Sequence, residues 1–427
     1  DSLSRLLKLA GREVTTQYYV NDMGRQIAII VCGITELGLK IEDYEGDKID
    51  HKVGKLYFDA NKAVEEDENL SAKVDELIQK YEEGSDSELN EIFEHVVSSC
   101  ISGMKETLKR INITHDDFVW EGQFVRSGEV DELVKYIKKE GFTRENDVLY
   151  IDLTDFNIEK EFVLLRSNGT SLYSTRDLAY HKYKSTLGDT VLDILGSDHK
   201  LAAKQIKVIF EEIFRQTPPE VIFYEFITLP EGSMSTRRGK FVSVDELIDE
   251  AVSRAHGEIK SRNPDLTEEE ITLMAEEIGV GAVRFFIAKL SPEKHLTFKW
   301  DEALSFERGC ASIQYAHARA CKLLNKSGRD IASLSVSDNW VPNDVEKDLV
   351  RQIAKFPQVV EDCANKQRVH NITQYSQDLA SSFNKFYKSE QVIGSDVEDA
   401  RLILVDRAKT TIKNALDILG VSAPEKM

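Results

Sequence analysis

The sequence has few cysteines, and none of them stands in a spacing that binds metal. Its 427 residues include five cysteines, with no C-x-x-C pair among them. This usage argues against a thiolate zinc site and for buried free thiols in a reducing compartment. We therefore expect a cytoplasmic protein with no metal site. The five cysteines are Cys32, Cys100, Cys310, Cys321 and Cys363.

Long apolar runs, internal repeats and low-complexity tracts are also missing. No apolar stretch approaches the roughly 18 residues that a membrane span needs, and no signal-peptide pattern opens the chain. Hydrophobic residues make up 41% and charged residues 30%, which is a globular composition. The length predicts two to four domains without a membrane partner.

Excess basic charge is missing too, since the formal net charge is −20. Residues 41–160 carry 15 basic and 31 acidic side chains, whereas residues 301–427 carry 17 and 18. Because the acidity is concentrated in one segment, the near-neutral remainder still allows a local track of cations for RNA phosphates.

Short apolar runs alternate with helical patterns between 148 and 226, which is typical of a doubly wound parallel sheet. A strand expected at 14–20 would join the same sheet. The charge-rich stretch before residue 148 predicts a largely helical insertion, and the chain after 300 predicts a helical bundle. We thus expect an α/β domain plus an all-α domain. Further strands are expected at 148–153, 162–165, 191–195 and 221–226, and the clearest helices at 62–82, 86–110, 129–139, 198–215, 243–260 and 267–290.

A polar loop with three cations follows the last expected strand. It reads Gly232-Ser-Met-Ser-Thr-Arg-Arg-Gly-Lys240. Backbone amides and guanidinium groups in such a loop can hold a triphosphate and stabilise charge on leaving pyrophosphate. A solvated basic loop is the alternative that the local sequence leaves open.

A second candidate site lies between residues 167 and 179. The sequence predicts a tight turn at Ser167-Asn-Gly-Thr170, a short strand at Leu172-Tyr173 and a helix N-cap at Thr175. Tyr173 and Asp177 would then lie near the C-terminal edge of the sheet, where open α/β folds bind ligands. Alternatively, Asp177 merely complements the helix dipole.

A third candidate is the segment Leu195-Gly-Ser-Asp-His199, in which a strand end leads through glycine into a helix. Free amides there favour an anion or a ribose phosphate, and His199 could donate to a substrate. A glycine that permits tight packing, with Asp198 as a helix cap, explains the pattern equally well.

The fourth candidate lies on the C-terminal helices, where aromatic and basic residues interleave. Such side chains suit stacking on unpaired RNA bases beside phosphate contacts. Core aromatics with solvated lysines are the alternative. The candidate tRNA-binding residues are Tyr315, Arg319, Lys385, Phe386, Tyr387, Lys388 and Arg401.

Taken together and in this order, the segments resemble arginyl-tRNA synthetase, a class I aminoacyl-tRNA synthetase. Tyr19-Val-Asn-Asp-Met-Gly-Arg-Gln26 resembles the family's N-Y-I-N-D-x-G-x-Q segment, and Leu172-Tyr-Ser-Thr-Arg-Asp-Leu-Ala-Tyr180 its Y-x-T-R-D-x-A signature. Met234-Ser-Thr-Arg-Arg-Gly239 is similar to a form of the second class I motif, KMSKS. Gln314-Tyr-Ala-His-Ala-Arg319 matches the opening of the anticodon-binding domain.

The resemblance implies a ligase that activates L-arginine with ATP and Mg²⁺ and transfers it to the 3′ end of tRNA(Arg). We also expect a monomer, and neither a tightly bound cofactor nor, given the cysteine spacing, zinc. The implied segments are a first part of a Rossmann-like catalytic domain (1–40), an acidic insertion (41–147), the second half of the catalytic domain (148–230), a KMSKS-like loop with connecting helices (231–300) and an anticodon-binding domain (301–427).

Residue roles also follow from the resemblance. Tyr173, Asp177 and His199 would bind arginine, with Asp177 paired to the guanidinium, because a carboxylate accepts two parallel N–H bonds. The implied ATP-binding residues are Gly196, Ser197, Asp198 and Met234, and the implied catalytic residues are Ser235, Arg237 and Arg238.

Two features depart from the family pattern. The first class I motif, His-x-Gly-His, is not in the sequence, so we expect a chain truncated before or within that motif and poorly active alone. Ser233 stands where the second motif has its leading lysine. Another class I synthetase is a competing hypothesis, although a cysteine enzyme would need a thiolate zinc site. A non-catalytic tRNA-binding or regulatory relative is the other.

Overall fold

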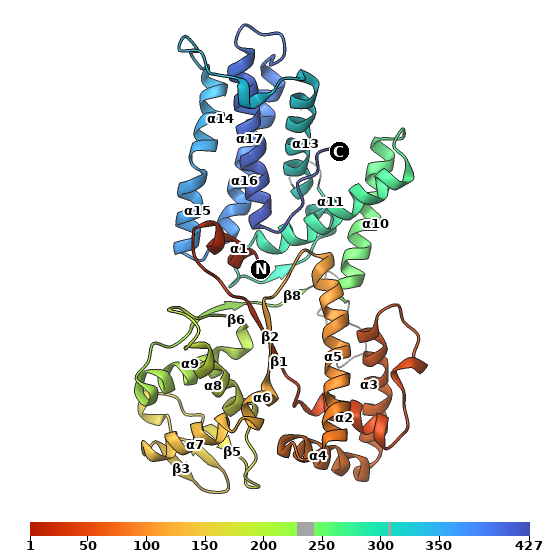
Figure 1. Ribbon diagram of the computed structural model, residues 1–427, viewed down its shortest axis with the longest axis vertical. Helices are drawn as coiled ribbons and strands as arrows, with labels where there is room; N and C mark the ends of the chain where they lie inside the picture. The colour runs from red at the N-terminus through yellow and green to blue at the C-terminus, as the bar shows by residue number, and fades with distance from the viewer. Residues whose placement is uncertain (229–242, 306–308) are drawn as a thin grey trace. The chain divides into compact units, whose positions relative to one another are not determined.

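The computed structural model describes residues 1–228, 243–305 and 309–427 (Figure 1). The chain forms two compact units, which are described one at a time. The α/β unit comprises Thr15–Glu106 and His115–Tyr224, and the helical unit comprises Asp1–Val14, Thr107–Thr114 and Glu225–Met427. Within the described ranges, no helix is both long enough and apolar enough to cross a lipid bilayer.

The first part of the α/β unit is a helical layer built on one apolar cluster. Buried side chains of this cluster include Ile30, Leu56, Leu77 and Phe93. The predicted helix at 86–110 is confirmed, whereas the one predicted at 62–82 is divided at Asp67 between two helices, the second of which ends at Gly84 with a left-handed φ of +66°. The layer consists of α2 (Arg25–Thr35), α3 (Ile49–Glu66), α4 (Glu68–Glu83) and α5 (Ser87–Arg110).

Two pairs of strands are parallel, as the α/β prediction required. β1 (Gln17–Val20) pairs with β2 (Asp117–Trp120), and β6 (Leu192–Gly196) pairs with β7 (Glu220–Tyr224). Among the described residues these pairs are separate hydrogen-bonded sheets. The sequence did not predict β2, because its four residues lie within a charged segment whose pattern is otherwise helical.

The strands predicted at 148–153 and 162–165 exist, but their assignment to the parallel sheet was wrong. β3 (Thr143–Glu145), β4 (Leu149–Ile151) and β5 (Phe162–Leu165) form an antiparallel sheet. A parallel neighbour needs a crossover of about a dozen residues or more, usually helical. The link from β4 to β5 is shorter and holds only the 3₁₀ turn η2 (Thr154–Phe156).

Helices pack on these strands around the largest core cluster of the α/β unit. Phe124, Ile151, Leu164, Leu178 and Phe210 are fully buried within it. The helix predicted at 198–215 is confirmed, although its last turn is π-helical (η4, Ile209–Phe214). The helices concerned are α6 (Glu121–Arg126), α7 (Glu129–Lys139), α8 (Tyr173–Lys184) and α9 (Lys200–Val208).

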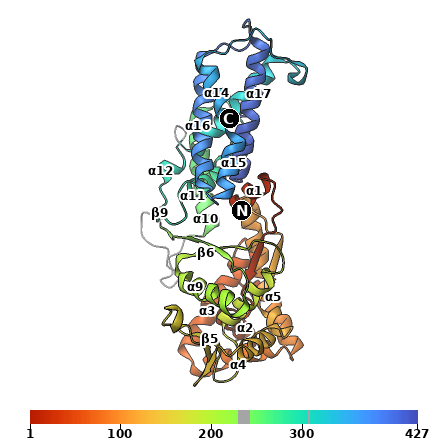
Figure 2. The same ribbon diagram turned by 90° about the vertical axis from the view of Figure 1, so that its left-hand side faces the viewer.

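The helical unit combines a helical hairpin with a bundle (Figure 2). The hairpin consists of α10 (Val244–Arg262) and α11 (Glu268–Ala288), both predicted, and each starts with a capping box. The bundle core is aliphatic and aromatic, with Leu379, Phe383 and Leu416 fully buried. The bundle consists of α13 (Cys310–Ser327), α14 (Asp344–Ala354), α15 (Phe356–Asn365), α16 (His370–Ser389) and α17 (Glu398–Ile418).

Smaller elements complete the helical unit. The short strands β8 (Ile227–Thr228) and β9 (Leu296–Thr297) are parallel, and the unit also holds α1 (Ser2–Leu9), α12 (Trp300–Ala303) and the 3₁₀ turn η6 (Ile331–Ser333).

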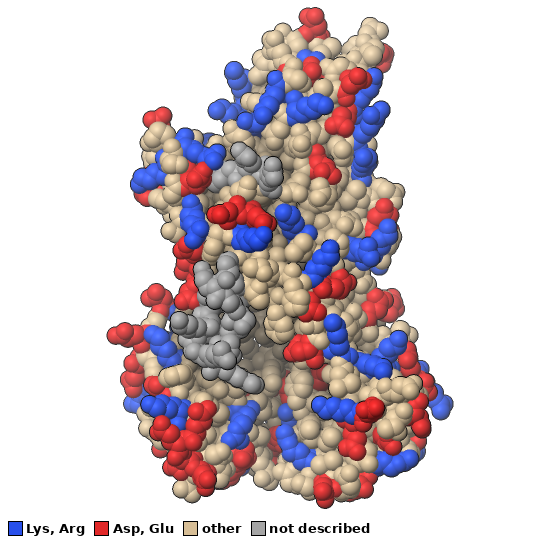
Figure 3. Space-filling model, turned by 180° about the vertical axis from the view of Figure 1, so that it is seen from behind, with Lys and Arg blue, Asp and Glu red and all other residues tan. Residues whose placement is uncertain are grey.

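Cysteines and surface charge agree with the sequence. All five thiols are free, and all are buried except Cys100, which is half-buried. Acidic side chains gather over the helical layer of the α/β unit on the face in Figure 3, whereas lysines and arginines are frequent on the bundle. The distribution matches the concentration of negative charge in the segment 41–160.

Candidate functional site

The second candidate segment folds as a turn that leads directly into α8. Gly169 has a φ of +85°, and the Gly169 amide donates to the Arg166 carbonyl at 2.9 Å, so the predicted turn is confirmed. The predicted strand at Leu172-Tyr173 and the predicted cap at Thr175 are wrong, because α8 already begins at Tyr173. The Thr175 hydroxyl donates instead to the buried Leu164 carbonyl, at 2.6 Å.

Tyr173 and Asp177 lie one helical turn apart and therefore share a face of α8. The Tyr173 ring centroid is 6.4 Å from that of Tyr19, which in turn stacks on Tyr180. The Tyr19 hydroxyl is buried and has no hydrogen-bond partner among the described residues. Burial, and then the nearby carboxylates, raise the pKa of both Tyr19 and Tyr173, so both phenols keep their protons and can donate.

Glu121 is a site residue that the sequence did not reveal. It lies at the start of α6, directly after β2, and is fully buried. One carboxylate oxygen accepts from Arg176 Nε, and the other, Oε2, has no partner in the described chain. Burial raises the pKa of Glu121 to about 7, the Arg176 cation opposes this, and Asp177 adds a smaller upward effect.

Arg176, one residue before Asp177, ties this carboxylate to the helical layer. Its Nη1 donates to Glu82 Oε1 on α4 and to the Ser171 carbonyl, each at 3.0 Å. All the polar groups of this cluster are buried, and burial also raises the pKa of Glu82. The cation therefore links two buried carboxylates that would otherwise repel each other.

Asp22 also holds the start of α6 in place. Its Oδ1 accepts from the Gly122 amide at 2.7 Å, and its Oδ2 accepts from the Tyr81 hydroxyl at 2.9 Å. A Cβ at position 122 would lie 2.5 Å from Asp22 Oδ2, so the contact requires glycine. The Asn21-Asp22-Met23-Gly24 turn thus supports the segment that carries Glu121. This role explains why Asp22, an acidic residue directly after β1, is fully buried.

At the third candidate segment, the predicted strand, glycine and helix are present. Gly196 ends β6, a 3₁₀ turn (η3, Ser197–His199) follows, and α9 begins at Lys200. The side chains of Asp198 and His199 are 61% and 42% exposed, and Asp198 makes no cap hydrogen bond. In the described residues, no hydrogen bond, ion pair or ring contact joins His199 to Tyr173 or Asp177. The predicted capping role of Asp198 is therefore wrong.

The first candidate segment lies outside the described residues. Positions 229–242 include Ser233, Met234, Ser235, Arg237 and Arg238, so their expected roles in ATP binding and catalysis stay predictions.

In the bundle, three of the seven expected RNA-binding residues come together on the surface. The Arg319 guanidinium lies 4.1 Å from the Tyr315 ring centroid and 5.2 Å from that of Tyr387. Tyr315 is 40% exposed, and Arg319 Nη1 donates to Asn384 Oδ1 at 2.8 Å. These residues form an aromatic and cationic platform on α13 and α16, and the exposed Lys385 and Lys388 lie on α16 as well.

Two of the seven residues do not fit a role in binding RNA. Phe386 is fully buried in the bundle core, so it has no face to stack on a base. The Arg401 guanidinium is occupied by Glu346, Glu390 and the Gln391 carbonyl, at 2.6–2.7 Å. For Phe386 the alternative of a core aromatic is correct, whereas the Arg401 guanidinium is held by ion pairs that would compete with RNA phosphates.

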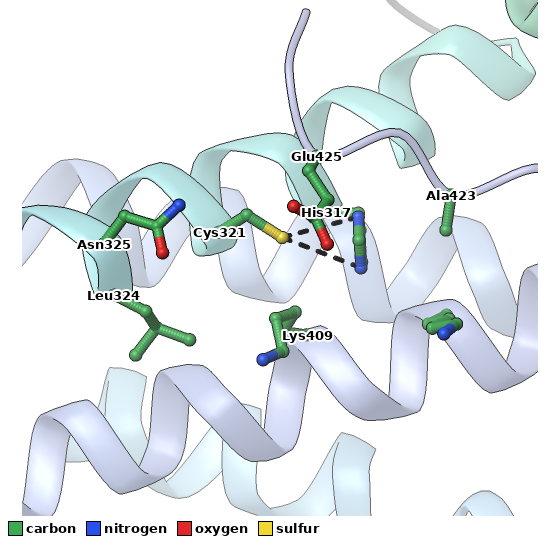
Figure 4. Close-up of a pocket in the computed structure, with 8 residues that line it drawn as sticks. His317, Cys321, Leu324, Asn325, Lys409, Ala423 and Glu425 are labelled. Carbon is green, nitrogen blue, oxygen red and sulfur yellow. Dashed lines mark hydrogen bonds between the residues drawn. The ribbon is translucent and has the colours of Figure 1, made fainter. Parts of the chain in front are cut away.

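The Gln-Tyr-Ala-His-Ala-Arg segment also has an inward face, which holds the C-terminal residues. Gln314 Nε2 donates to the Ser422 carbonyl at 3.0 Å, and His317 Nδ1 lies 2.9 Å from the Pro424 carbonyl oxygen. His317 also borders a cavity of about 210 Å³ (Figure 4). The cavity is lined by His317, Cys321, Leu324, Asn325, Lys409, Lys413, Ala423 and Glu425.

Comparisons with known proteins agree with both units. Residues 1–300 match the family model described as tRNA synthetases class I (R), catalytic domain, and residues 313–427 match the DALR anticodon binding domain. The arginine–tRNA ligase of Methanobrevibacter smithii is 79% identical over 427 residues, covering the whole chain and 74% of that protein. The enzyme of Methanothermobacter thermautotrophicus is 59% identical over the same length, covering 75% of that protein.

A solved structure extends the agreement to the fold. The arginyl-tRNA synthetase of Thermus thermophilus aligns over the whole chain and 78% of its own, with a TM-score of 0.82 and 27% identity. The predicted fold class and activity are thereby confirmed, and arginine, ATP and tRNA(Arg) are the substrates. The chain belongs to the arginyl-tRNA synthetases, the class I ligases that join arginine to its tRNA.

Proposed function

We propose that this arginine–tRNA ligase recognises the guanidinium of its substrate with two carboxylates, Asp177 and Glu121. The single observation that carries the proposal is Glu121 Oε2, which is buried beside Asp177 without a partner among the described residues. An unpaired buried carboxylate oxygen is costly, and a guanidinium is the group whose fork of N–H donors satisfies such oxygens best.

The two phenols complete the proposed arginine pocket. Tyr173 offers an exposed ring face at its entrance, and Tyr19 offers a buried hydroxyl that has no partner in the described chain. Both keep their protons near neutral pH, because burial and the adjacent negative charges raise each pKa. The phenols therefore act as neutral donors and do not compete with the carboxylates for the cation.

Charge-removing variants of the full-length enzyme test this pocket. Asp177→Asn should weaken arginine binding by about 2–4 kcal/mol, because one partner of a buried charged pair is lost. Glu121→Gln should weaken it too and reduce discrimination against citrulline, whose ureido group is neutral. Isothermal titration calorimetry measures both effects, and Asp189→Asn, an exposed carboxylate of the same unit, is the matched control. Unchanged arginine affinity in Asp177→Asn and Glu121→Gln would refute the pocket.

We also propose that ATP binds at the end of β6, against Gly196, Ser197 and Asp198, with His199 near the substrates. Support comes from Gly196, which ends β6 and leads through the 3₁₀ turn Ser197–His199 into α9, at the kind of strand end where open α/β folds bind ligands. Met234 would also bind ATP, and Ser235, Arg237 and Arg238 would act in catalysis, although all four lie outside the described residues. Mg²⁺ would accompany the triphosphate, and chelation of Mg²⁺ should abolish ATP–pyrophosphate exchange.

The remaining proposals concern the state of the protein. We propose a monomer without zinc. We also propose that the enzyme works in the cytoplasm, where tRNA is charged for protein synthesis. Burial raises the pKa of the Cys310 and Cys363 thiols, which disfavours the thiolate that zinc needs. Sedimentation and metal analysis of the purified enzyme test the first two statements.

A further inference from the structure

A buried histidine lies directly behind the proposed arginine-binding carboxylate. His181 is on α8, one turn after Asp177, and only 4% of its surface is exposed. It faces Asp193 on β6, which is 9% exposed. None of the sequence motifs includes this pair, and arginine recognition as proposed above does not use it.

Both ring nitrogens of His181 face oxygen atoms that only accept hydrogen bonds. Nδ1 lies 2.7 Å from the Asp177 carbonyl oxygen and 3.4 Å from Asp177 Oδ1. Nε2 lies 2.9 Å from Asp193 Oδ2. A neutral imidazole has one N–H and one bare nitrogen, so it would place a lone pair against one of these oxygens. Protons on both nitrogens avoid this repulsion, so the contacts favour an imidazolium, with Nε2 at ion-pair distance from Asp193 but not aligned for a hydrogen bond.

The neighbouring charges balance this cation. Lys184, on α8, donates to Asp193 Oδ1, and the Tyr180 ring meets His181 edge-on at 6.2 Å. Burial alone would lower the pKa of His181, but Asp177 and Asp193 outweigh it and raise the pKa to about 9. The same contacts bring the pKa of Asp193 to about 2, although burial opposes them. Two cations thus face two carboxylates.

We propose that His181 is a positioning residue for arginine recognition: its imidazolium, anchored by Asp193, holds the Asp177 carboxylate in place on the face of α8 that carries Tyr173. The proposal rests on the proposed role of Asp177. Because the His181 ring contacts Asp177 at both its backbone and its carboxylate, it restrains the side chain without touching the substrate. The affinity for arginine should then depend on the charge of His181, although His181 does not contact arginine.

The test compares His181→Gln with the unchanged full-length enzyme in arginine-dependent ATP–pyrophosphate exchange with tRNA present. Gln keeps a donor but lacks the charge. We expect the KM for arginine to rise roughly 10-fold at pH 7.5, as for the loss of a hydrogen bond to a charged group. The kcat and the KM for ATP should stay nearly constant. His95→Gln, an exposed histidine on α5, is the matched control.

The pH dependence separates a positioning role from a merely structural one. As pH rises through about 9, His181 loses its charge in the unchanged enzyme, and the KM for arginine of that enzyme should rise. The ratio of the KM of His181→Gln to the KM of the unchanged enzyme should therefore fall toward 1 at pH 10. The amine of arginine titrates equally in both proteins and cancels in this ratio. Asp193→Asn is the second variant, since it removes the anchoring carboxylate while keeping His181. It should move the pH at which the KM for arginine begins to rise to a lower value.

Each outcome bears on one statement. A KM ratio near 1 at pH 7.5, or a ratio that is constant from pH 7 to 10, would overturn the positioning role. If His181→Gln fails to fold, the positioning role would be overturned equally by an Asp193→Asn enzyme whose KM for arginine begins to rise at the same pH as in the unchanged enzyme. Normal arginine affinity in Asp177→Asn would instead remove the proposed pocket. A defective Asp177→Asn together with a normal His181→Gln leaves that pocket standing and rejects only this inference.

Discussion

Replacing Arg176 by methionine should destabilise the α/β unit strongly and in a pH-dependent way. The change removes the cation that joins Glu121, which is fully buried, to Glu82, whose side chain is 8% exposed. It also removes one of two donors to the Ser171 carbonyl, which keeps Arg166 Nη1 at 3.1 Å. Loss of one member of a buried charged cluster typically costs about 3–5 kcal/mol. We expect a free-energy loss of that order at pH 8.

The pH dependence follows from the direction of the pKa shifts. Burial raises the pKa of Glu121 from 4.5 to about 7 even with Arg176 present, which corresponds to about 3 kcal/mol of ionisation cost. A carboxyl group whose pKa is raised in the folded state binds its proton more tightly there, so stability falls as pH rises through this window. Without Arg176 the pKa of Glu121 and of Glu82 should rise further. At pH 5 both groups can be protonated, and the loss should shrink to roughly 1–2 kcal/mol.

The assay is urea unfolding of the 427-residue chain at pH 5 and pH 8, reported by Trp120 fluorescence. Trp120 precedes Glu121 in the sequence, and replacing Trp300 and Trp340 by phenylalanine makes it the sole tryptophan. At pH 8 the unfolding midpoint should fall by roughly 1–2 M urea. Arg144→Met, an exposed arginine of the same unit, is the control. Equal destabilisation at both pH values would refute the reasoning, since packing loss alone is indifferent to the charge of the carboxylates.

Two further predictions concern the helical unit. Gly420→Ala should destabilise the helical unit by about 2–4 kcal/mol in thermal unfolding, because φ is +66° and the new Cβ would lie 2.1 Å from Arg284 Nη2. The control Gly328→Ala, at φ +61° with open space around it, should cost only about 1 kcal/mol, and equal losses would contradict the prediction. Tyr315→Ala should weaken binding of tRNA(Arg) by about 1–3 kcal/mol in filter binding at fixed salt, and less for an anticodon-swapped tRNA; an equal loss for both RNAs would reduce the platform to a nonspecific surface.

Helices were predictable wherever their stop signals and apolar stripes are local. The end of α4 at Gly84 and the starts of α10 and α11 depend on residues within one turn, so the chain order alone reveals them. The start of α8 was misplaced by three residues, because the cap is Leu172 and not Thr175. Thr175 has the chemistry of a cap, but its hydroxyl finds the Leu164 carbonyl on another element, and no local pattern records such a partner.

Residue order by itself determined the enzyme family, because the Tyr173-x-x-x-Asp177 spacing and the Gln314–Arg319 segment keep their order along the chain. It placed Tyr173 in a strand, however, and only the structure puts Tyr173 and Asp177 on one face of α8. Only the tertiary structure decided that Glu121 lies beside Asp177, since the two are far apart in sequence and meet through a short parallel strand hidden in a charged segment. Tertiary structure likewise assigned Phe386 to the bundle core and Arg401 to ion pairs with Glu346 and Glu390. Burial and ion pairing depend on which elements pack together, and residue type alone does not fix that choice.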